Sequence, residues 1–351
     1  MSLFGRSKNL VPSSSQPKFP SVQSTTSSIQ QNKYAWSLGG VLSIVGVLML
    51  LYTFYVSVPP GEFDVTDAAM SRLTHDNPSL QTAPQPESLV KGYRMASTLA
   101  SLMEILLHKR GGYITNDIMP PNIFLDDIKN WEYGALVMIR DASAALRNNF
   151  ARAQSQSQED VDLALADPLF VFDNNSWQLP QTESEYEKGL VHLNNYARRL
   201  AAGEASFSAR ADNLRQYLEV VEKRLGGYST RLTASTERRD LSVGGQSIIN
   251  TTPWMEVDDV FWEARGATWA LLHLMKAIAL DFNNVVNVKN AQVTVNIIIF
   301  EFEESQTTTL SPMVLNGSGF GLFANYSLTM ANYITRANAA MLDFRDLLVR
   351  G

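Results

Sequence analysis

Three carboxylates in one short stretch are the strongest catalytic candidates in this sequence. Two carboxylates that face a substrate can act as acid and base, for example on a glycan, and carboxylate oxygens also bind hard cations. The candidates are Glu256, Asp258 and Glu263. Because this stretch opens a predicted helix, capping and the helix dipole explain the same residues without catalysis. The structural interpretation is favoured over a hydrolase or lyase.

A glycine-rich segment supplies the second candidate site. Its glycines alternate just before a predicted helix, where backbone N–H groups and the helix dipole can hold an anion. No lysine follows as in a P-loop, and the glycine spacing is not that of a dinucleotide fingerprint. Ser318 also lacks the flanking glycines of a nucleophile elbow. A structural loop is favoured, and the ligand-binding candidates are Asn316, Gly317, Ser318, Gly319 and Gly321.

Cysteine and histidine usage argues against a metal centre. The sequence has no cysteine, which excludes disulfides, thiolate catalysis and cysteine-bound zinc or iron–sulfur clusters. The four histidines are far apart, and no two of them have the i, i+4 spacing of a zinc-binding helix. We therefore predict no metal ion and no cofactor. The histidines are His75, His108, His192 and His273.

The location of any such site depends first on an apolar run near the N-terminus. No charged side chain occurs from Leu38 to Val58, and roughly 20 such residues cross a bilayer core. The alternative is a cleaved signal peptide, but its apolar region would be only about 7 to 15 residues long. No small-x-small cleavage site follows, because Val58 is succeeded directly by two prolines. The sequence therefore predicts a single-pass transmembrane helix.

Charge sets the predicted orientation of this helix. The residues before it carry four basic side chains and no acid, whereas acidic residues follow it. The positive-inside rule then places the N-terminus in the cytoplasm and the C-terminal domain in the periplasm, with the helix in the inner membrane of a Gram-negative bacterium. The domain is acidic, which argues against nucleic acid as a partner. The basic residues are Arg6, Lys8, Lys18 and Lys33.

Composition divides the chain into four parts. Residues 1–33 are rich in Ser, Gln and Pro and are expected to form a disordered cytoplasmic tail. Residues 34–58 are the predicted anchor, and residues 59–88, with three prolines near their end, are expected to be a linker. Residues 89–351 carry enough apolar side chains for a large helical domain. The fold class is therefore mainly α.

Apolar spacing predicts most of the helices in the domain. The segment from 293 to 304 is ambiguous between strand and helix, and we favour helix. Thr182 and Glu185 have the spacing of a capping box, and Asp173 to Trp177 is typical of an Asx turn. Helices are expected over residues 89–110, 126–154, 182–202, 206–225, 258–283 and 325–349.

Several longer segments resemble a known bacterial family. They include GGYITNDIMPP (Gly111 to Pro121), NWEYGALVMIRD (Asn130 to Asp141), FDNNSWQLP (Phe172 to Pro180) and TPWMEVDDVFWEARGATWALLHL (Thr252 to Leu274). Together with SPMVLNGSGFGLFANYSLTMANYITRANAA (Ser311 to Ala340), they are similar to the family called domain of unknown function 2333. The resemblance covers about residues 88 to 351. It implies a membrane-anchored protein of Gram-negative bacteria and assigns no catalytic residue or ligand.

These observations favour a non-catalytic envelope protein. Its partners are expected to be the lipid bilayer, through the N-terminal helix, and another envelope protein or a second copy of the chain. The first alternative is a periplasmic hydrolase or lyase that uses the acidic cluster. The second is a ligand sensor whose pocket is formed by the glycine-rich loop, although the cytoplasmic tail is too short to be a signalling domain.

Overall fold

The structure is a computed structural model of the whole chain. It describes residues 25–76, 85–122, 125–152, 158–234, 240–243, 246–249, 253, 256–307, 314 and 326–350. Its contacts divide the chain into two compact units, Met1–Tyr52 and Thr53–Gly351. The candidate residues Asn316 to Gly321 lie outside the described residues.

The first unit contains most of helix α1 (Thr25–Val56). Its segment Gly39–Val56 is long and apolar enough to cross a membrane, by length and composition, and only 6% of it is buried. A core helix of a soluble protein would be mostly buried, and this segment is not, so it is a candidate membrane span. The helix begins at Thr25, so residues 25–33, which the sequence assigns to a disordered tail, are helical.

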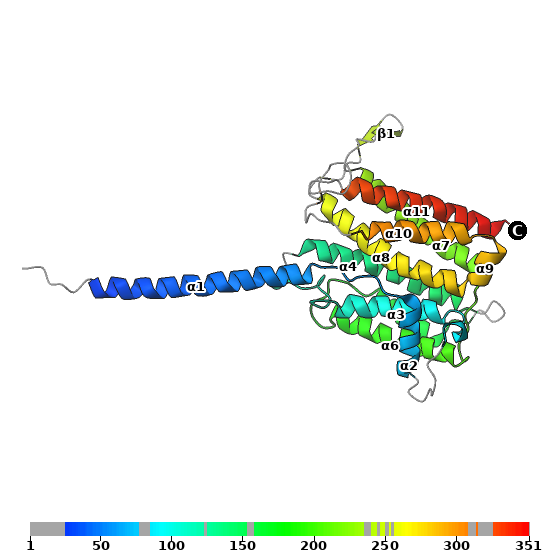
Figure 1. Cartoon of the computed structure of the whole chain (residues 1–351), viewed down its shortest axis with the longest axis horizontal. Helices are drawn as coiled ribbons and strands as arrows, with labels where there is room; N and C mark the ends of the chain where they lie inside the picture. Colours follow the sequence, from blue (N-terminus) through cyan, green and yellow to red (C-terminus); the bar gives the residue numbers. More distant parts are fainter. Residues whose placement is uncertain are drawn as a thin grey trace, which may run out of the picture. The chain divides into compact units, whose positions relative to one another are not determined.

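The second unit is a helical domain, as the sequence predicts (Figure 1). Two short segments interrupt the α-helices: Pro86–Ser88 forms a 3-10 turn, and Leu146–Phe150 continues α4 as a π-helix. The α-helices are α2 (Val65–Asp76), α3 (Tyr93–His108), α4 (Asp126–Ala145), α5 (Val161–Phe170), α6 (Thr182–Ala201), α7 (Ala211–Thr233), α8 (Val257–Asp281), α9 (Asn283–Val288), α10 (Gln292–Ser305) and α11 (Tyr326–Val349). A two-stranded antiparallel hairpin, β1 (Asp240–Val243) and β2 (Gln246–Ile249), follows α7.

Several local predictions can be compared with these helices. The ambiguous segment 293–304 is helical and forms most of α10. The Asx turn is confirmed, because the Asn175 amide donates to the Asp173 carboxylate at 3.0 Å. The capping box is wrong: Gln181 precedes the helix, and the Thr182 hydroxyl instead donates to the carbonyls of Asp173 and Ser176.

Helix α2 is the main departure from the expected organisation. It lies within residues 59–88, for which the sequence predicts a linker. Val65 and Ala69 are buried, and Leu73 packs against the same core. Their spacing of four residues places them on one helix face. The prolines that suggested a linker lie beyond the end of this helix, so they do not prevent it from forming.

The core of the domain is built on the crossing of α4 and α8. A Cβ on Gly134 would lie 1.8 Å from the carbonyl oxygen of Glu263, and one on Gly266 would lie 1.9 Å from the carbonyl oxygen of Trp131. The two backbones therefore touch, which only glycine permits at these positions. Trp131 and Trp269 pack beside the crossing with ring centroids 4.9 Å apart.

Substitution of a glycine at this crossing is expected to destabilise the domain strongly. Gly266→Ala places a methyl group against a backbone carbonyl that cannot rotate away, so α4 and α8 must separate. We expect a loss of at least about 3 kcal/mol in the free energy of unfolding. Urea denaturation followed by circular dichroism measures it.

Gly227→Ala in α7 is the matched control, because nothing lies within 4 Å of a Cβ there. Removing a helix-interior glycine should raise stability by up to about 1 kcal/mol. Equal stability of the Gly266→Ala and Gly227→Ala proteins would contradict the close crossing.

Candidate functional site

The three predicted catalytic carboxylates have different neighbours. Glu256 is exposed and precedes α8, and the Asp258 carboxylate accepts a hydrogen bond from the Asp259 amide at 3.1 Å. Glu263 forms an ion pair with Arg231 of α7 at 2.7 Å. Glu263 is thus engaged with α7, while Asp258 stays with the first turn of its own helix.

A different group of carboxylates meets where α4 and α8 begin. Asp126 and Asp127 are in the first turn of α4, and Asp258 and Asp259 are in the first turn of α8. Asn130 of α4 donates to Asp259 at 2.6 Å. Asp127 and Asp259 each lie about two helical turns before the crossing glycine of their helix. The close crossing therefore brings the two acidic ends together.

Burial and mutual repulsion change the protonation of this group. Burial, followed by the charges of Asp126, Asp258 and Asp259, raises the pKa of Asp127 to about 7. Burial also raises the pKa of Asp259. A protonated carboxyl beside ionised ones can donate a proton in acid–base catalysis. Carboxylates are also favoured at helix N-termini for electrostatic reasons, which gives the group a structural role.

Metal binding by these side chains has no support in the geometry. Within the part of the chain that the structure describes, no group of three or more His, Asp or Glu side chains is arranged to hold a metal ion. Instead, burial favours the protonated form of Asp127, Asp259 accepts a hydrogen bond from the Asn130 amide, and Glu263 pairs with Arg231.

Glu263 of α8 lines a small hollow together with side chains of α4 and α7. The hollow is about 200 Å³ in volume and contains basic and aromatic side chains of α4 and α7. Arg224 donates to both oxygens of Asp141, and Arg231 pairs with Glu263, so these cations are already neutralised. The lining residues are Tyr133, Val137, Lys223, Arg224, Gly227, Tyr228, Arg231 and Glu263.

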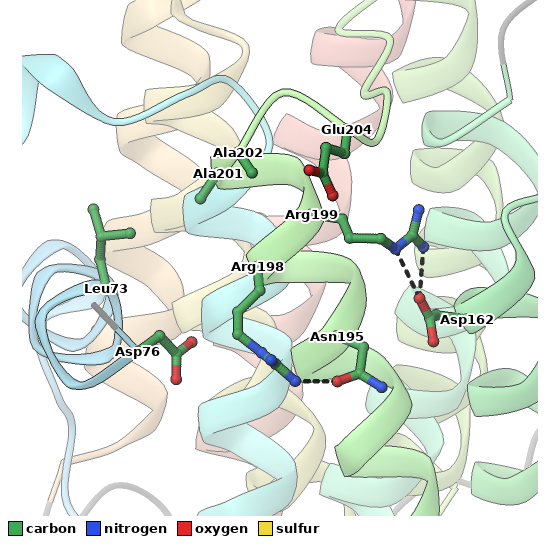
Figure 2. Close-up of a pocket in the computed structure, with 9 residues that line it drawn as sticks. All are labelled: Leu73, Asp76, Asp162, Asn195, Arg198, Arg199, Ala201, Ala202 and Glu204. Carbon is green, nitrogen blue, oxygen red and sulfur yellow. Dashed lines mark hydrogen bonds and ion pairs between the residues drawn. The ribbon is translucent and has the colours of Figure 1, made fainter. Parts of the chain in front are cut away.

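A larger hollow, of about 750 Å³, lies between α2, α5 and α6 (Figure 2). Arg199 binds Asp160 and Asp162 of α5, so its charge is balanced within the protein. Arg198 is exposed and donates to Asn195. The remaining lining residues are Leu73, Asp76, Ala201, Ala202 and Glu204.

A second hollow, of about 470 Å³, lies on the other side of α2. Asp76 lines both hollows, so we name the two together the α2–α6 surface. Arg72 fixes α2 here by donating to Asn194 of α6 at 2.8 Å and to Glu104 of α3 at 2.7 Å. The surface offers charged and amide groups and suits polar contacts with a partner. It was not predicted, because its α2 side belongs to the expected linker.

The segment that follows α1 is bound to the domain. The Trp269 indole donates to the Gly61 carbonyl at 3.1 Å, and the Phe63 amide donates to His273 Nε2 at 3.0 Å. The Phe63 ring also stacks on the His273 ring at 4.0 Å. Val56, in the last turn of α1, is fully buried. We name residues 56–63 the junction; it is held by α8 rather than free.

His273 at the junction is a neutral imidazole. Burial lowers its pKa to about 4. Its Nδ1 lies 2.8 Å from the Trp269 carbonyl, which can only accept, so Nδ1 carries the proton and Nε2 is left to accept from Phe63. The residue is fully buried in α8.

A buried ion pair orders the loop after α3. Lys109 and Glu132 are in contact at 2.5 Å, and both side chains are almost fully buried. Glu132 also accepts hydrogen bonds from the amides of Ile114 and Thr115, and Lys109 donates to the Gly112 carbonyl at 2.6 Å. Such bonds are needed to compensate two charges that have left water. The loop is therefore fixed to α4.

An apolar helix followed by a helical domain that binds the end of that helix defines the class of this protein. The chain belongs to the bacterial family described as "uncharacterized protein conserved in bacteria (DUF2333)", whose model matches residues 29–351. This confirms the resemblance seen in the sequence, and the match includes the apolar helix as well as the domain. Neither a curated protein nor a solved structure matches the chain.

The raised pKa of Asp127 predicts that ionisation of this carboxyl at higher pH lowers the free energy of unfolding. The unfolded carboxyl has a pKa near 3.9, so between about pH 4 and 7 the folded state holds a proton that the unfolded state has released. Stability is lost as pH rises through this window. Asp127→Asn should therefore stabilise the protein by about 1–2 kcal/mol at pH 8, allowing for solvent screening, and by less at pH 5.

Urea denaturation of both proteins at the two pH values measures this difference. Asp126→Asn, at the exposed neighbouring position in the same first turn, controls for the helix dipole. An effect of Asp127→Asn that is independent of pH would show that Asp127 is ionised throughout.

Proposed function

We propose that this protein is a membrane-anchored, non-catalytic scaffold or adaptor of the bacterial cell envelope. In this proposal α1 crosses the inner membrane, the N-terminal tail is cytoplasmic, and the helical domain lies in the periplasm and binds another envelope protein. The basic residues before the apolar helix and the acidic residues after it support this orientation. The family match is consistent with a bacterial setting.

The observation that carries the proposal is the bound junction. An enzyme acting on a diffusing substrate needs only a tether, whereas a scaffold must hold its binding surface at a defined place. Trp269 and His273 hold Gly61 and Phe63 through hydrogen bonds, and α2 begins two residues after Phe63. The α2–α6 surface is thus connected to the anchor through a short, ordered segment.

The α2–α6 surface is the proposed partner-binding region. It combines an exposed arginine, Arg198, with the amide of Asn195 and the carboxylates of Asp76 and Glu204. Mixed charge of this kind favours a partner surface with complementary acidic, basic and amide groups, and it contributes to association rate and specificity. The hollows are open and have several charged side chains in their lining, unlike the enclosed, mainly apolar pockets that bind most small ligands.

The enzyme alternative has weaker support. General acid–base catalysis requires the carboxylates to face one substrate position. Glu263 pairs with Arg231, Glu256 is exposed, and Asp258 bonds within its own helix turn. The sensor alternative depends on Asn316 to Gly321, which lie outside the described residues. The scaffold is therefore preferred.

The junction predicts an acid-sensitive attachment of the domain. The unfolded His273 side chain has a pKa near 6.5, so between about pH 6.5 and 4 the unfolded state binds a proton that the folded state excludes. The stability that neutral His273 provides is present above pH 6.5 and is lost as pH falls. We expect hydrogen exchange at the Phe63 amide, corrected for intrinsic rates, to accelerate from pH 7 to pH 5.

In the His273→Leu protein the amide has no acceptor, so exchange at Phe63 should be fast at both pH values. His192→Leu is the matched control, because His192 contacts Asp162 of α5 rather than the junction. Unchanged protection of Phe63 in His273→Leu would contradict a junction held by this hydrogen bond.

Partner binding predicts site-specific crosslinking in cells. A photoreactive amino acid at Ala202, which is exposed in the larger hollow, should give a discrete crosslinked species. Combining Arg198→Glu with the photoreactive residue at position 202 should reduce the yield of the crosslinked species several-fold, because the substitution reverses the charge beside the crosslinking position. The same photoreactive residue at Val288, exposed on α9, is the control and should give none. Identical crosslinked species from positions 202 and 288 would show that the α2–α6 surface is not the binding region.

A further inference from the structure

Two loops of the domain are joined side by side. The first, residues 113–122, follows α3, and the second, residues 171–181, precedes α6. Asn116 of the first loop donates to the Ser176 carbonyl at 3.0 Å and to Glu183 at 2.7 Å. The Tyr113 hydroxyl donates to the Asn174 carbonyl at 3.2 Å. Asn116 and Tyr113 are themselves buried, so the loops form one ordered structure.

These ordered loops expose large apolar side chains. Leu179 is 98% exposed, Met119 is 65% exposed, and Ile118 and Trp177 are also exposed. Ile118 and Met119 follow closely on Asn116, and Trp177 and Leu179 follow closely on Ser176, so all four lie within three residues of the Asn116–Ser176 hydrogen bond that joins the loops. We name them the loop-tip patch. Apolar side chains gathered at ordered loop tips mark an interaction surface rather than random exposure.

The chain just before the first loop contacts the end of the apolar helix. A Cβ on Gly111 would lie 2.7 Å from the Val56 side chain, and the Arg110 guanidinium lies 5.4 Å from the centre of the Tyr55 ring. Gly111 lies two residues before the first loop. The chain from Gly111 to Ile118 can span about 25 Å at most, and it is shorter here because it turns.

A hollow beside the same helix end extends this surface. It is about 720 Å³ in volume and is formed by Val58 to Gly61 of the junction and by the last turn of α3 with the residues after it. Arg110 is exposed at its rim. An exposed arginine near the end of a membrane helix lies at the depth of lipid phosphates.

We propose that the loop-tip patch inserts into the interfacial layer of the bilayer that α1 crosses. This inference rests on the proposed membrane anchoring. Trp177 is of the residue type that prefers the headgroup region, and Leu179, Met119 and Ile118 gain by leaving water for the acyl boundary. The bilayer is the occupant because Tyr55 and Val56, at the end of the helix proposed to cross it, contact the residues just before the first loop. The domain thereby contacts the membrane at two points, the anchor and the patch.

The absence of cysteine allows a direct test in the full-length protein. Leu179→Cys and Met119→Cys are each labelled with an environment-sensitive fluorophore. The protein is reconstituted in vesicles of phosphatidylethanolamine and phosphatidylglycerol, with and without lipids that carry a nitroxide near the headgroup. We expect both probes to emit at shorter wavelength than in water and to lose emission when the nitroxide lipid is present.

Two further positions control this measurement. Val288→Cys is matched in exposure, because Val288 is 76% exposed. Its helix α9 follows Asp281, and Asp281 accepts a hydrogen bond from the Met95 amide at the start of α3. Arg110 lies beyond the opposite end of α3. That probe should be insensitive to the nitroxide. Val47→Cys lies within the apolar span of α1 and reports on the anchor itself.

The outcomes separate the two proposals. Quenching at residues 179 and 119, with none at 288, supports insertion of the loop-tip patch. If the probes at 179 and 119 behave like the one at 288 while the probe at 47 enters the bilayer, the anchor stands and this inference is overturned; a second protein copy or a soluble partner would then cover the patch. If the probe at 47 also stays outside the bilayer, both proposals fail.

Discussion

The close contact between the backbones of α4 and α8 is the constraint on which the domain depends. Because Gly134 and Gly266 allow the helices to touch, side chains on both sides of the crossing are set at fixed positions. Toward the helix N-termini this brings Asp127 and Asp259 into one acidic group. Toward the C-terminus of α8 it places Trp269 against Trp131, and the Trp269 indole binds the junction. A single packing contact thus positions both features.

The junction shows how packing of this kind reaches the end of the apolar helix. Trp131 contacts Trp269, Trp269 contacts His273, and His273 holds Phe63, so one continuous aromatic row connects α4 to the start of the folded domain. Each ring is fixed by its neighbours, and the hydrogen bonds to Gly61 and Phe63 act on backbone atoms. The attachment therefore depends on the side chains of α8 and, within residues 59–63, on the Phe63 ring.

Most of the fold follows from helical spacing, and most of the site does not. Long amphipathic segments such as α3, α4 and α6 can be predicted because their apolar residues recur at helical intervals over several turns. α2 was missed because its apolar face has only Val65, Ala69 and Leu73, and nearby prolines suggested a linker. The acidic group joins residues more than 100 positions apart. Predicting it requires knowing that Gly134 meets Gly266, which one sequence does not reveal.

In the proposed scaffold, attachment to a membrane changes what the α2–α6 surface must provide. Arg72 and Arg199 are neutralised by Glu104, Asp160 and Asp162, so much of the charge there serves the fold. Polar surfaces of this kind bind weakly when both partners diffuse freely, because desolvation offsets much of the attraction. For a partner held at the same membrane, the effective concentration is far higher, and weak contacts suffice if the geometry allows them. A bound junction supplies that geometry, since it limits the positions at which the domain can meet its partner.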